Sequence, residues 1–222
     1  MKIIGHRGAR GLAPENTIAS IEKALECGVN EIEIDVRVTK DNQVVLVHNR
    51  FAEHDGHRLL VSANSYQELR QLKPDLTLLE DAIRTIHRRV PLMIEVKPQV
   101  PIQPVIGIVQ NLLASGWQAS DFTFGSFSQT TLKALHQAMP AIGIVVIERL
   151  SGTYAMYRAK QVDAHRISIN HFFLRRRFLK HAIARGYEVC VYTLNNPAKA
   201  QAFGQQGVTG VITDRPDLYA SK

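Results

Sequence analysis

Short apolar runs alternate with longer amphipathic segments along almost the whole chain. The short runs are rich in β-branched residues and have the length of strands, whereas the longer segments repeat their apolar positions with the period of a helix. This pattern predicts strands at residues 3–5, 31–36, 44–48, 92–97, 122–126, 142–147, 166–170, 188–193 and 210–213. It predicts helices at residues 17–27, 65–72, 79–88, 103–114, 129–138, 174–185 and 197–205. Such alternation is typical of a parallel sheet covered by helices.

The predicted strands outnumber those of a closed eight-stranded barrel by one. The segment between the second and third runs is too short for a crossover helix, and Lys40–Gln43, with Asp-Asn at its tip, has the composition of a hairpin turn. The third run would then be antiparallel to the end of the second strand. The remaining strands predict an α/β fold, a TIM (β/α)8 barrel with a small β-hairpin excursion after strand 2.

The hairpin also makes a geometric prediction. If Lys40 pairs with Gln43, the same register pairs Asp35 with His48. Residues that face one another across antiparallel strands have Cβ atoms about 5 Å apart. A carboxylate and a histidine would then meet at the mouth of the barrel, and a slip of one residue would separate them.

The second strand carries acidic residues at alternate positions. Glu31, Glu33 and Asp35 alternate with apolar residues, so the three carboxylates lie on one face. Glu95 and Lys97 share a face of the next parallel strand in the same way. Glu33, Asp35 and Glu95 would converge near the carboxyl ends of these strands, and three carboxylates suit a hard divalent cation, Mg²⁺ or Ca²⁺. The alternative is a surface strand with its acids in solvent, which the apolar opposite face disfavours.

Two histidines and two cationic residues are placed to act beside such an ion. His6 and Arg7 follow the first strand, and His48 ends the hairpin. Two histidines near a metal can serve as general base and general acid, and Arg7 and Lys97 can neutralise a phosphate. The alternatives are a structural histidine, a surface arginine, and an ion pair between Lys97 and Glu95.

These residues belong to an ordered set of motifs that runs through nearly the whole chain. The motifs are His6-Arg7-Gly8, Pro14-Glu15-Asn16-Thr17, Glu33-Ile34-Asp35-Val36, Thr39-Lys40-Asp41, Val44-Val45 leading to His48, Glu95-Val96-Lys97, Ser126-Phe127, Tyr192-Thr193-Leu194-Asn195 and Gly210-Val211-Ile212-Thr213-Asp214-Arg215-Pro216. In this order the set resembles the glycerophosphodiester phosphodiesterase family. The chain departs from the family at Asn49, where an aspartate is usual, and at Tyr192, where a tryptophan is usual.

The resemblance implies a metal-dependent enzyme that hydrolyses glycerophosphodiesters to sn-glycerol 3-phosphate and an alcohol. It implies catalytic His6 and His48, a divalent metal on Glu33, Asp35 and Glu95, and substrate or phosphate contacts from Arg7, Lys97 and Tyr192. One alternative is lysophospholipase D-type activity on lysophospholipids, with an apolar mouth formed in part by Phe172-Phe173-Leu174. Another is a non-catalytic binding module on a degenerate barrel, because a fold alone does not fix a function.

Composition narrows the remaining possibilities. The net charge is +7, but the densest basic cluster, Arg175-Arg176-Arg177, matches no nucleic-acid motif, so we expect a small-molecule substrate and no nucleic acid. Binding to DNA or to an anionic membrane is the remaining alternative. We expect no disulfide framework from Cys27 and Cys190 and no signal peptide, and no apolar run reaches about 20 residues. We therefore expect a single domain over residues 1–222, in the cytoplasm, without stable membrane insertion.

Overall fold

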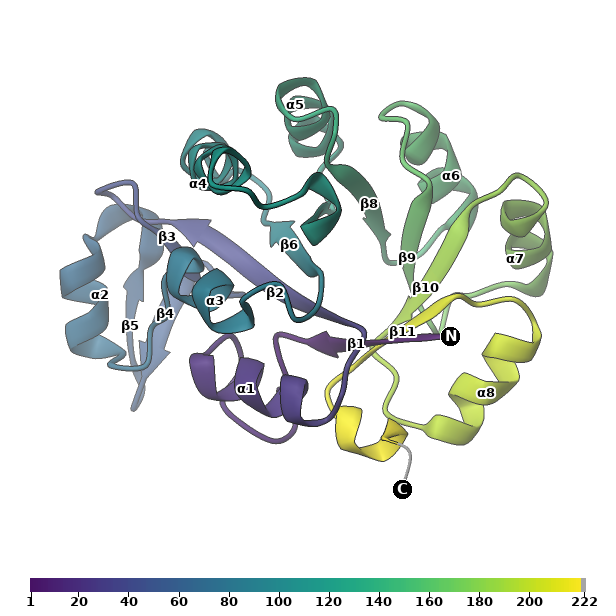
Figure 1. The fold of residues 1–222 in the computed structure, drawn as a ribbon, viewed down its shortest axis with the longest axis horizontal. Helices are drawn as coiled ribbons and strands as arrows, with labels where there is room; N and C mark the ends of the chain where they lie inside the picture. Colours follow the sequence, from purple (N-terminus) through teal and green to yellow (C-terminus); the bar gives the residue numbers. More distant parts are fainter. Residues whose placement is uncertain (221–222) are drawn as a thin grey trace.

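In the computed structural model, which describes residues 1–220, parallel strands close into a barrel with helices outside it (Figure 1). The barrel strands of this region are β1 (Lys2–His6), β2 (Glu31–Val38), β6 (Leu92–Val96), β7 (Phe122–Ser126), β8 (Gly143–Glu148), β9 (Arg166–Asn170), β10 (Glu188–Tyr192) and β11 (Gly210–Thr213). Each pairs with the next in this order, and β11 pairs with β1 to close the ring. The structure thus confirms the predicted TIM barrel.

Helices surround the barrel at most of the predicted positions. They are α1 (Ile18–Glu26), α3 (Leu79–Ile86), α4 (Gln103–Ala114), α5 (Gln129–Ala138), α6 (Gly152–Lys160), α7 (Arg176–Ile183) and α8 (Pro197–Gln205). The sequence pattern does not predict α6. No helix within residues 1–220 combines the length and the apolar character needed to cross a membrane.

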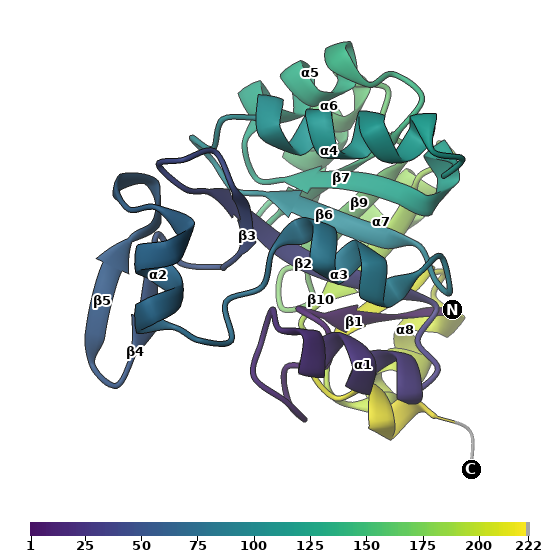
Figure 2. The ribbon, with the colours of Figure 1, turned by 60° about the vertical axis from the view of Figure 1, so that its left-hand side comes forward.

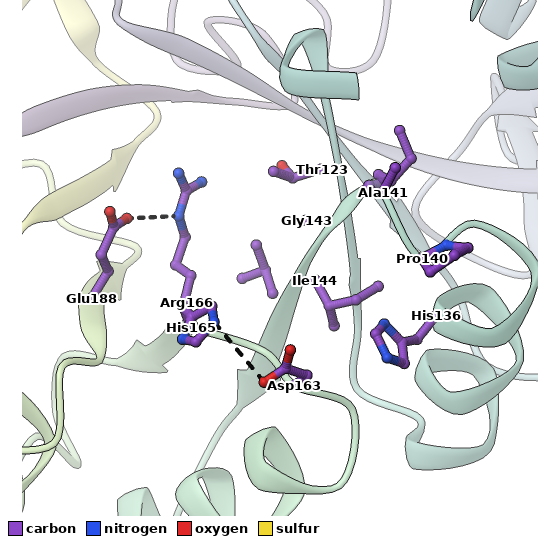
Figure 3. A pocket seen from close by; sticks show the side chains of 12 residues that line it. Thr123, His136, Pro140, Ala141, Gly143, Ile144, Asp163, His165, Arg166 and Glu188 are labelled. Atoms are coloured by element: carbon purple, nitrogen blue, oxygen red, sulfur yellow. Dashed lines mark hydrogen bonds and ion pairs between the residues drawn. The ribbon is translucent and has the colours of Figure 1, made fainter. Parts of the chain in front are cut away.

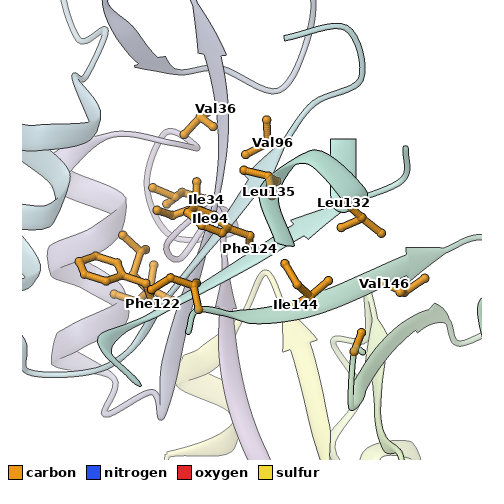
Figure 4. Packing of buried hydrophobic residues seen from close by; sticks show 14 of the residues in the cluster. Ile34, Val36, Ile94, Val96, Phe122, Phe124, Leu132, Leu135, Ile144 and Val146 are labelled. Carbon is orange, nitrogen blue, oxygen red and sulfur yellow. The ribbon is translucent and has the colours of Figure 1, made fainter. Parts of the chain in front are cut away.

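The apolar core lies between the strands and the helices. Ile34 and Val36 of β2 are fully buried there beside Ile94 and Val96 of β6 (Figure 4). These residues occupy alternate strand positions, so the positions between them face the inside of the barrel. The acidic face of β2 is therefore the inner face, and the alternative of a surface strand is wrong.

The excursion after β2 stands to one side of the barrel (Figure 2). It contains β3 (Val44–Leu46), a hairpin of β4 (Phe51–His54) and β5 (His57–Leu60), and α2 (Tyr66–Leu72). The hairpin of β4 and β5 is not predicted by the sequence pattern. The excursion has its own small apolar cluster, made of Val45, Val47, Ala52, Val61, Leu69 and Leu76.

The register of β2 with β3 differs from the predicted one by one residue. Val38 pairs with Val44 in the structure. Asp35 therefore lies opposite Val47, whose N–H donates a hydrogen bond to the Asp35 carbonyl at 3.1 Å. The predicted pairing of Asp35 with His48 is wrong.

The turn explains the shift. The connection comprises the five residues Thr39–Gln43, in which the Thr39 N–H donates to the Gln43 carbonyl at 2.9 Å and the Thr39 hydroxyl accepts from the Gln43 N–H at 2.9 Å. Strand β3 also ends at Leu46, before His48. The alternation of side chains along a strand therefore does not determine where His48 lies. It reaches the mouth of the barrel from a bend in the chain after β3.

Glu31 lies apart from the other acids of β2, at the amino end of the barrel. Its carboxylate accepts two hydrogen bonds from Arg166, at 2.7 and 2.8 Å, and Arg166 also contacts Glu188 at 3.2 Å. A cavity of about 320 Å³ opens beside Arg166 and Glu188 (Figure 3). This end of a TIM barrel serves stability, whereas active sites lie at the carboxyl end.

The loop after β1 approaches α1 very closely. Gly8 has a φ of +81°, and a Cβ built there would lie 2.5–2.6 Å from atoms of Ser20, including its backbone. The Gly8 N–H donates to the Glu33 carbonyl at 3.2 Å, and the Ser20 hydroxyl donates to the Arg7 carbonyl at 2.9 Å. This contact fixes the backbone on which His6 and Arg7 depend.

We expect Gly8→Ala to lower the free energy of unfolding by about 2–5 kcal/mol. The positive φ costs an L-residue about 1–2 kcal/mol, and the clash adds about 1–3 kcal/mol. Gly28→Ala is the matched control, because Gly28 has a φ of +71° but no atom within 4 Å of an added Cβ. Urea denaturation should show the larger loss for Gly8→Ala, and equal losses would contradict the proposed contact.

Candidate functional site

The predicted site residues come together at the carboxyl end of the barrel. The carboxyl ends of β1, β2, β6 and β10 and the chain after β3 border a cavity of about 170 Å³. The predicted site residues that line it are His6, Arg7, Glu33, His48, Glu95, Lys97 and Tyr192. The remaining one, Asp35, is buried and in contact with both Arg7 and Lys97.

Three carboxylates form the base of this site. Glu33, Asp35 and Glu95 each offer an oxygen, and these atoms all lie within 4.8 Å of one another. Glu33 Oε1 is buried and accepts no hydrogen bond from any residue in the range 1–220. An unpartnered buried carboxylate oxygen beside two others fits a hard divalent cation, which takes oxygen ligands.

The charges of the site are incompletely balanced. Lys97 Nζ contacts Asp35 at 2.5 Å and also contacts Glu95, and Arg7 Nε lies 3.0 Å from Asp35. Burial raises the pKa of Asp35, but Lys97 and Arg7 outweigh it and lower that pKa to about 2. Burial and the charge of Asp35 raise the pKa of Glu95 to about 7 and the pKa of Glu33 well above its usual value. Two cationic side chains, Lys97 and Arg7, thus contact a cluster of three carboxyl groups.

Asn16 orients Asp35. Its amide NH₂ donates to Asp35 Oδ2 at 3.0 Å, and its amide oxygen accepts from the Asp35 N–H at 3.1 Å. Thr17 is the N-cap of α1, and its hydroxyl accepts from the Ser20 N–H at 3.2 Å. Asn16 thus belongs to the support of the site, a function that sequence reasoning misses because an asparagine just before a helix is also a common capping residue.

His6 is held by a carboxylate from the far end of the chain. His6 Nδ1 lies 2.6 Å from Asp214 Oδ1, and Asn195 Nδ2 donates to Asp214 Oδ2 at 3.2 Å. Burial raises the pKa of Asp214, but the hydrogen bond and charge of His6 outweigh it, so that the net pKa is lowered. An ionised Asp214 fixes a proton on Nδ1 and leaves Nε2 free. Sequence reasoning finds Asp214 only as a motif member.

His48 is held by a neutral partner. Its Nδ1 lies 2.9 Å from Asn49 Oδ1, so the asparagine offers the ring an uncharged hydrogen-bond acceptor. Arg37 fixes the backbone here, since its Nε and Nη2 donate to the His48 carbonyl at 3.2 and 3.0 Å. Burial lowers the pKa of His48, and the charge of Lys97 adds to this against the opposite effect of Asp35. His48 is therefore neutral at neutral pH.

Tyr192 contributes its ring to the cavity wall. Its hydroxyl donates to the Glu148 carbonyl at 2.9 Å, and its ring meets Phe127 edge-on at 6.2 Å between centroids. Burial raises the pKa of Tyr192, so its hydroxyl stays protonated. The hydroxyl is engaged by the rim of the barrel, which leaves the aromatic face as the surface that a substrate can contact.

The sequence is similar to those of known proteins over nearly its whole length. A sequence model described as "Glycerophosphoryl diester phosphodiesterase family" matches residues 6–218, a range that includes all of the predicted site residues. The Bacillus subtilis protein YhdW is 30% identical, over 98% of this chain and 96% of its own. Lysophospholipase D GDPD1 of Rattus norvegicus is 26% identical, over 96% of this chain and 83% of its own.

A solved structure has a fold similar to that of this chain. A phosphodiesterase of Oleispira antarctica, in complex with the product sn-glycerol-3-phosphate, superposes with a TM-score of 0.88 at 26% identity. The alignment covers 98% of this chain and 94% of that chain. The likeness therefore extends over the barrel and its loops together.

We expect Glu33→Gln to weaken the binding of Mg²⁺ or Ca²⁺ by more than about tenfold, which is the loss typical of removing even an outer-sphere partner. Glu31→Gln is the matched control, because Glu31 lies on the same face of β2 but at the other end, where its replacement still accepts from Arg166. Isothermal titration calorimetry on both folded variants measures the difference. Equal affinity in the two variants would contradict a metal site at Glu33.

The partner of His48 makes a second prediction. Asn49→Asp should raise the pKa of His48, because a negative charge beside the ring favours the protonated form. Asn49→Ala should lower it, because the hydrogen bond that Asn49 Oδ1 accepts from the ring raises this pKa in the parent protein. NMR titration of the ring measures both shifts, and one pKa shared by all three proteins would show that Asn49 does not govern His48.

Proposed function

Since the chain belongs to the glycerophosphoryl diester phosphodiesterase family and is therefore a phosphoric diester hydrolase, we propose that its site hydrolyses glycerophosphodiesters to sn-glycerol 3-phosphate and an alcohol. The observation that carries the proposal is the gathering of three carboxylates, two cations and two histidines around one small cavity. A phosphodiester is an anion that needs charge neutralisation and two proton transfers, and this set of groups can supply both.

The carboxylates are proposed to hold a divalent cation. Glu33, Asp35 and Glu95 would be its ligands, and the unpartnered oxygen of Glu33 and the excess of acids over cations support this assignment. When bound, such an ion acts as a Lewis acid on a phosphoryl oxygen. Arg7 and Lys97 are proposed to bind the remaining phosphoryl oxygens, since both cations border the cavity.

The two histidines are proposed to divide the proton transfers. His6 directs Nδ1 at the ionised carboxylate of Asp214, which leaves Nε2 to carry a proton toward the departing oxygen, so we assign it the role of general acid. His48 faces the amide of Asn49 and has a lowered pKa, so it is neutral and suited to be the general base. The aromatic faces of Tyr192 and Phe127 are proposed to contact the carbon atoms of the glycerol.

We expect release of glycerol 3-phosphate from glycerophosphocholine and from glycerophosphoethanolamine. His6→Ala and His48→Ala should each lower the rate by about 10²–10⁴-fold, the range typical for loss of an acid or base. His136→Ala, which changes a histidine at the amino end of the barrel, should leave the rate unchanged. Full activity in both site variants would refute the assignment of the histidines.

The same assay tests the metal and the substrate class. EDTA should abolish the release of glycerol 3-phosphate, and Mg²⁺ or Ca²⁺ should restore it. Lysophosphatidylcholine is the competing substrate, because a relative named lysophospholipase D is 26% identical to this chain. Faster release of choline from lysophosphatidylcholine than of glycerol 3-phosphate from glycerophosphocholine would replace the proposed substrate with a lysophospholipid.

A further inference from the structure

The excess of positive charge is concentrated in one stretch of the chain. The residues between Glu148 and Glu188 include nine lysines and arginines but a single acid, Asp163, whereas the net charge of the whole chain is +7. The remainder of the chain is therefore close to neutral. Charge that served only to keep the protein in solution would need no such segregation.

This stretch includes part of the barrel rim that surrounds the candidate site. Residues 149–151 follow β8 and residues 171–175 follow β9, so both loops lie at the carboxyl end of the barrel. The helices that begin at these loops, α6 and α7, pack against each other (Figure 1). The hydrogen bond from Tyr192 to the Glu148 carbonyl joins this part of the rim to the cavity.

Four arginines lie in these loops and at the start of α7. Arg149, Arg175, Arg176 and Arg177 are exposed, and none of them forms an ion pair with another residue in the range 1–220. Arg175 is the N-cap of α7, and the next two arginines begin the helix. The helix dipole repels positive charge at this end. Three arginines here oppose local stability, so their position suits an anion outside the protein.

Apolar side chains project from the same loops. Leu150 is 60% exposed and Phe172 is 77% exposed. Their backbones are nevertheless fixed, because the Leu150 N–H donates to Glu148 Oε1 at 3.1 Å and the Phe172 N–H donates to Asn170 Oδ1 at 3.0 Å. The two side chains are thus largely exposed on ordered loops, and the Phe172 ring also lies 4.0 Å from the His171 ring and 5.2 Å from Lys199 Nζ.

A groove brings the exposed arginines and the apolar side chains together. It has a volume of about 680 Å³, and Leu150, Met156, Phe173 and Phe178 line it together with residues 175–177. Apolar side chains beside arginines match the boundary of a lipid bilayer, where acyl chains lie beneath charged phosphates. Nucleic acid is the weaker match, because bases could stack on the exposed rings of this surface but gain little from the aliphatic Leu150 and from the apolar lining of the groove, which a lipid surface also accounts for.

We propose that this basic and apolar rim, residues 149–157 and 171–177, docks on the surface of an anionic lipid bilayer. Leu150 and Phe172 enter the headgroup region, and the four exposed arginines contact lipid phosphates. In this orientation the mouth of the cavity faces the lipid, because the cavity mouth and the docking surface lie on the same rim of the barrel. The proposal depends on the surface alone and stands independently of the reaction catalysed.

Cosedimentation with vesicles tests the proposal on the full chain. The protein should bind vesicles that contain phosphatidylserine and phosphatidylcholine, should not bind phosphatidylcholine alone, and should dissociate as the salt concentration rises. The double variant Arg175→Gln/Arg176→Gln should bind about 25-fold more weakly, at about fivefold for each arginine. Phe172→Ser should also weaken binding.

The matched control is Lys133→Gln/Lys160→Gln, which removes the same charge from exposed positions outside the rim. This variant should bind like the parent. Equal weakening of the two double variants, no binding to the anionic vesicles, or binding to duplex DNA in preference to vesicles would each overturn the proposal. All variants should hydrolyse soluble glycerophosphocholine at the parent rate, which separates loss of docking from failure of the proposed reaction.

Discussion

Three carboxylates share one end of two neighbouring barrel strands, and their repulsion is the constraint on which the site depends. Asp35 stays ionised, with a pKa of about 2, because Lys97 and Arg7 lie against it. Burial raises the pKa values of Glu33 and Glu95, and the charge of Lys97 offsets this only in part. A further positive charge is stabilised in such surroundings, and this is the physical basis for proposing a divalent cation there.

Closure of the barrel supplies the second requirement, which is a fixed orientation for the reactive groups. His6 of β1 and Asp214 after β11 are 208 residues apart, yet they hydrogen-bond because the last strand pairs with the first. His48 enters from the excursion, where Arg37 of β2 fixes its carbonyl. The two histidines thus have different partners, a carboxylate and an amide, and this difference is the basis for assigning them different roles in proton transfer.

Local periodicity predicts the acid face of β2 correctly, because the alternation of a strand depends on neighbouring residues alone. Local sequence does not fix the register of the hairpin, because the apolar run after Gln43 can follow either a five-residue connection or a two-residue turn. Helix α6 is not predicted because Gly152–Lys160 begins with Gly-Thr-Tyr, which are poor helix formers. Asp214 is a member of a motif, but nothing local assigns it a role, because its partner His6 is brought near by tertiary structure.

A crystal structure with sn-glycerol 3-phosphate and Mn²⁺ tests the central claim most directly, because anomalous scattering locates the ion independently. The account predicts the ion bound by Glu33, Asp35 and Glu95, the phosphate in contact with Lys97, and Arg7 beside it. It also predicts a histidine on each side of the phosphorus. Glycerol 3-phosphate bound elsewhere, or an acid cluster still paired with its two cations and without an ion at saturating Mn²⁺, would contradict the account.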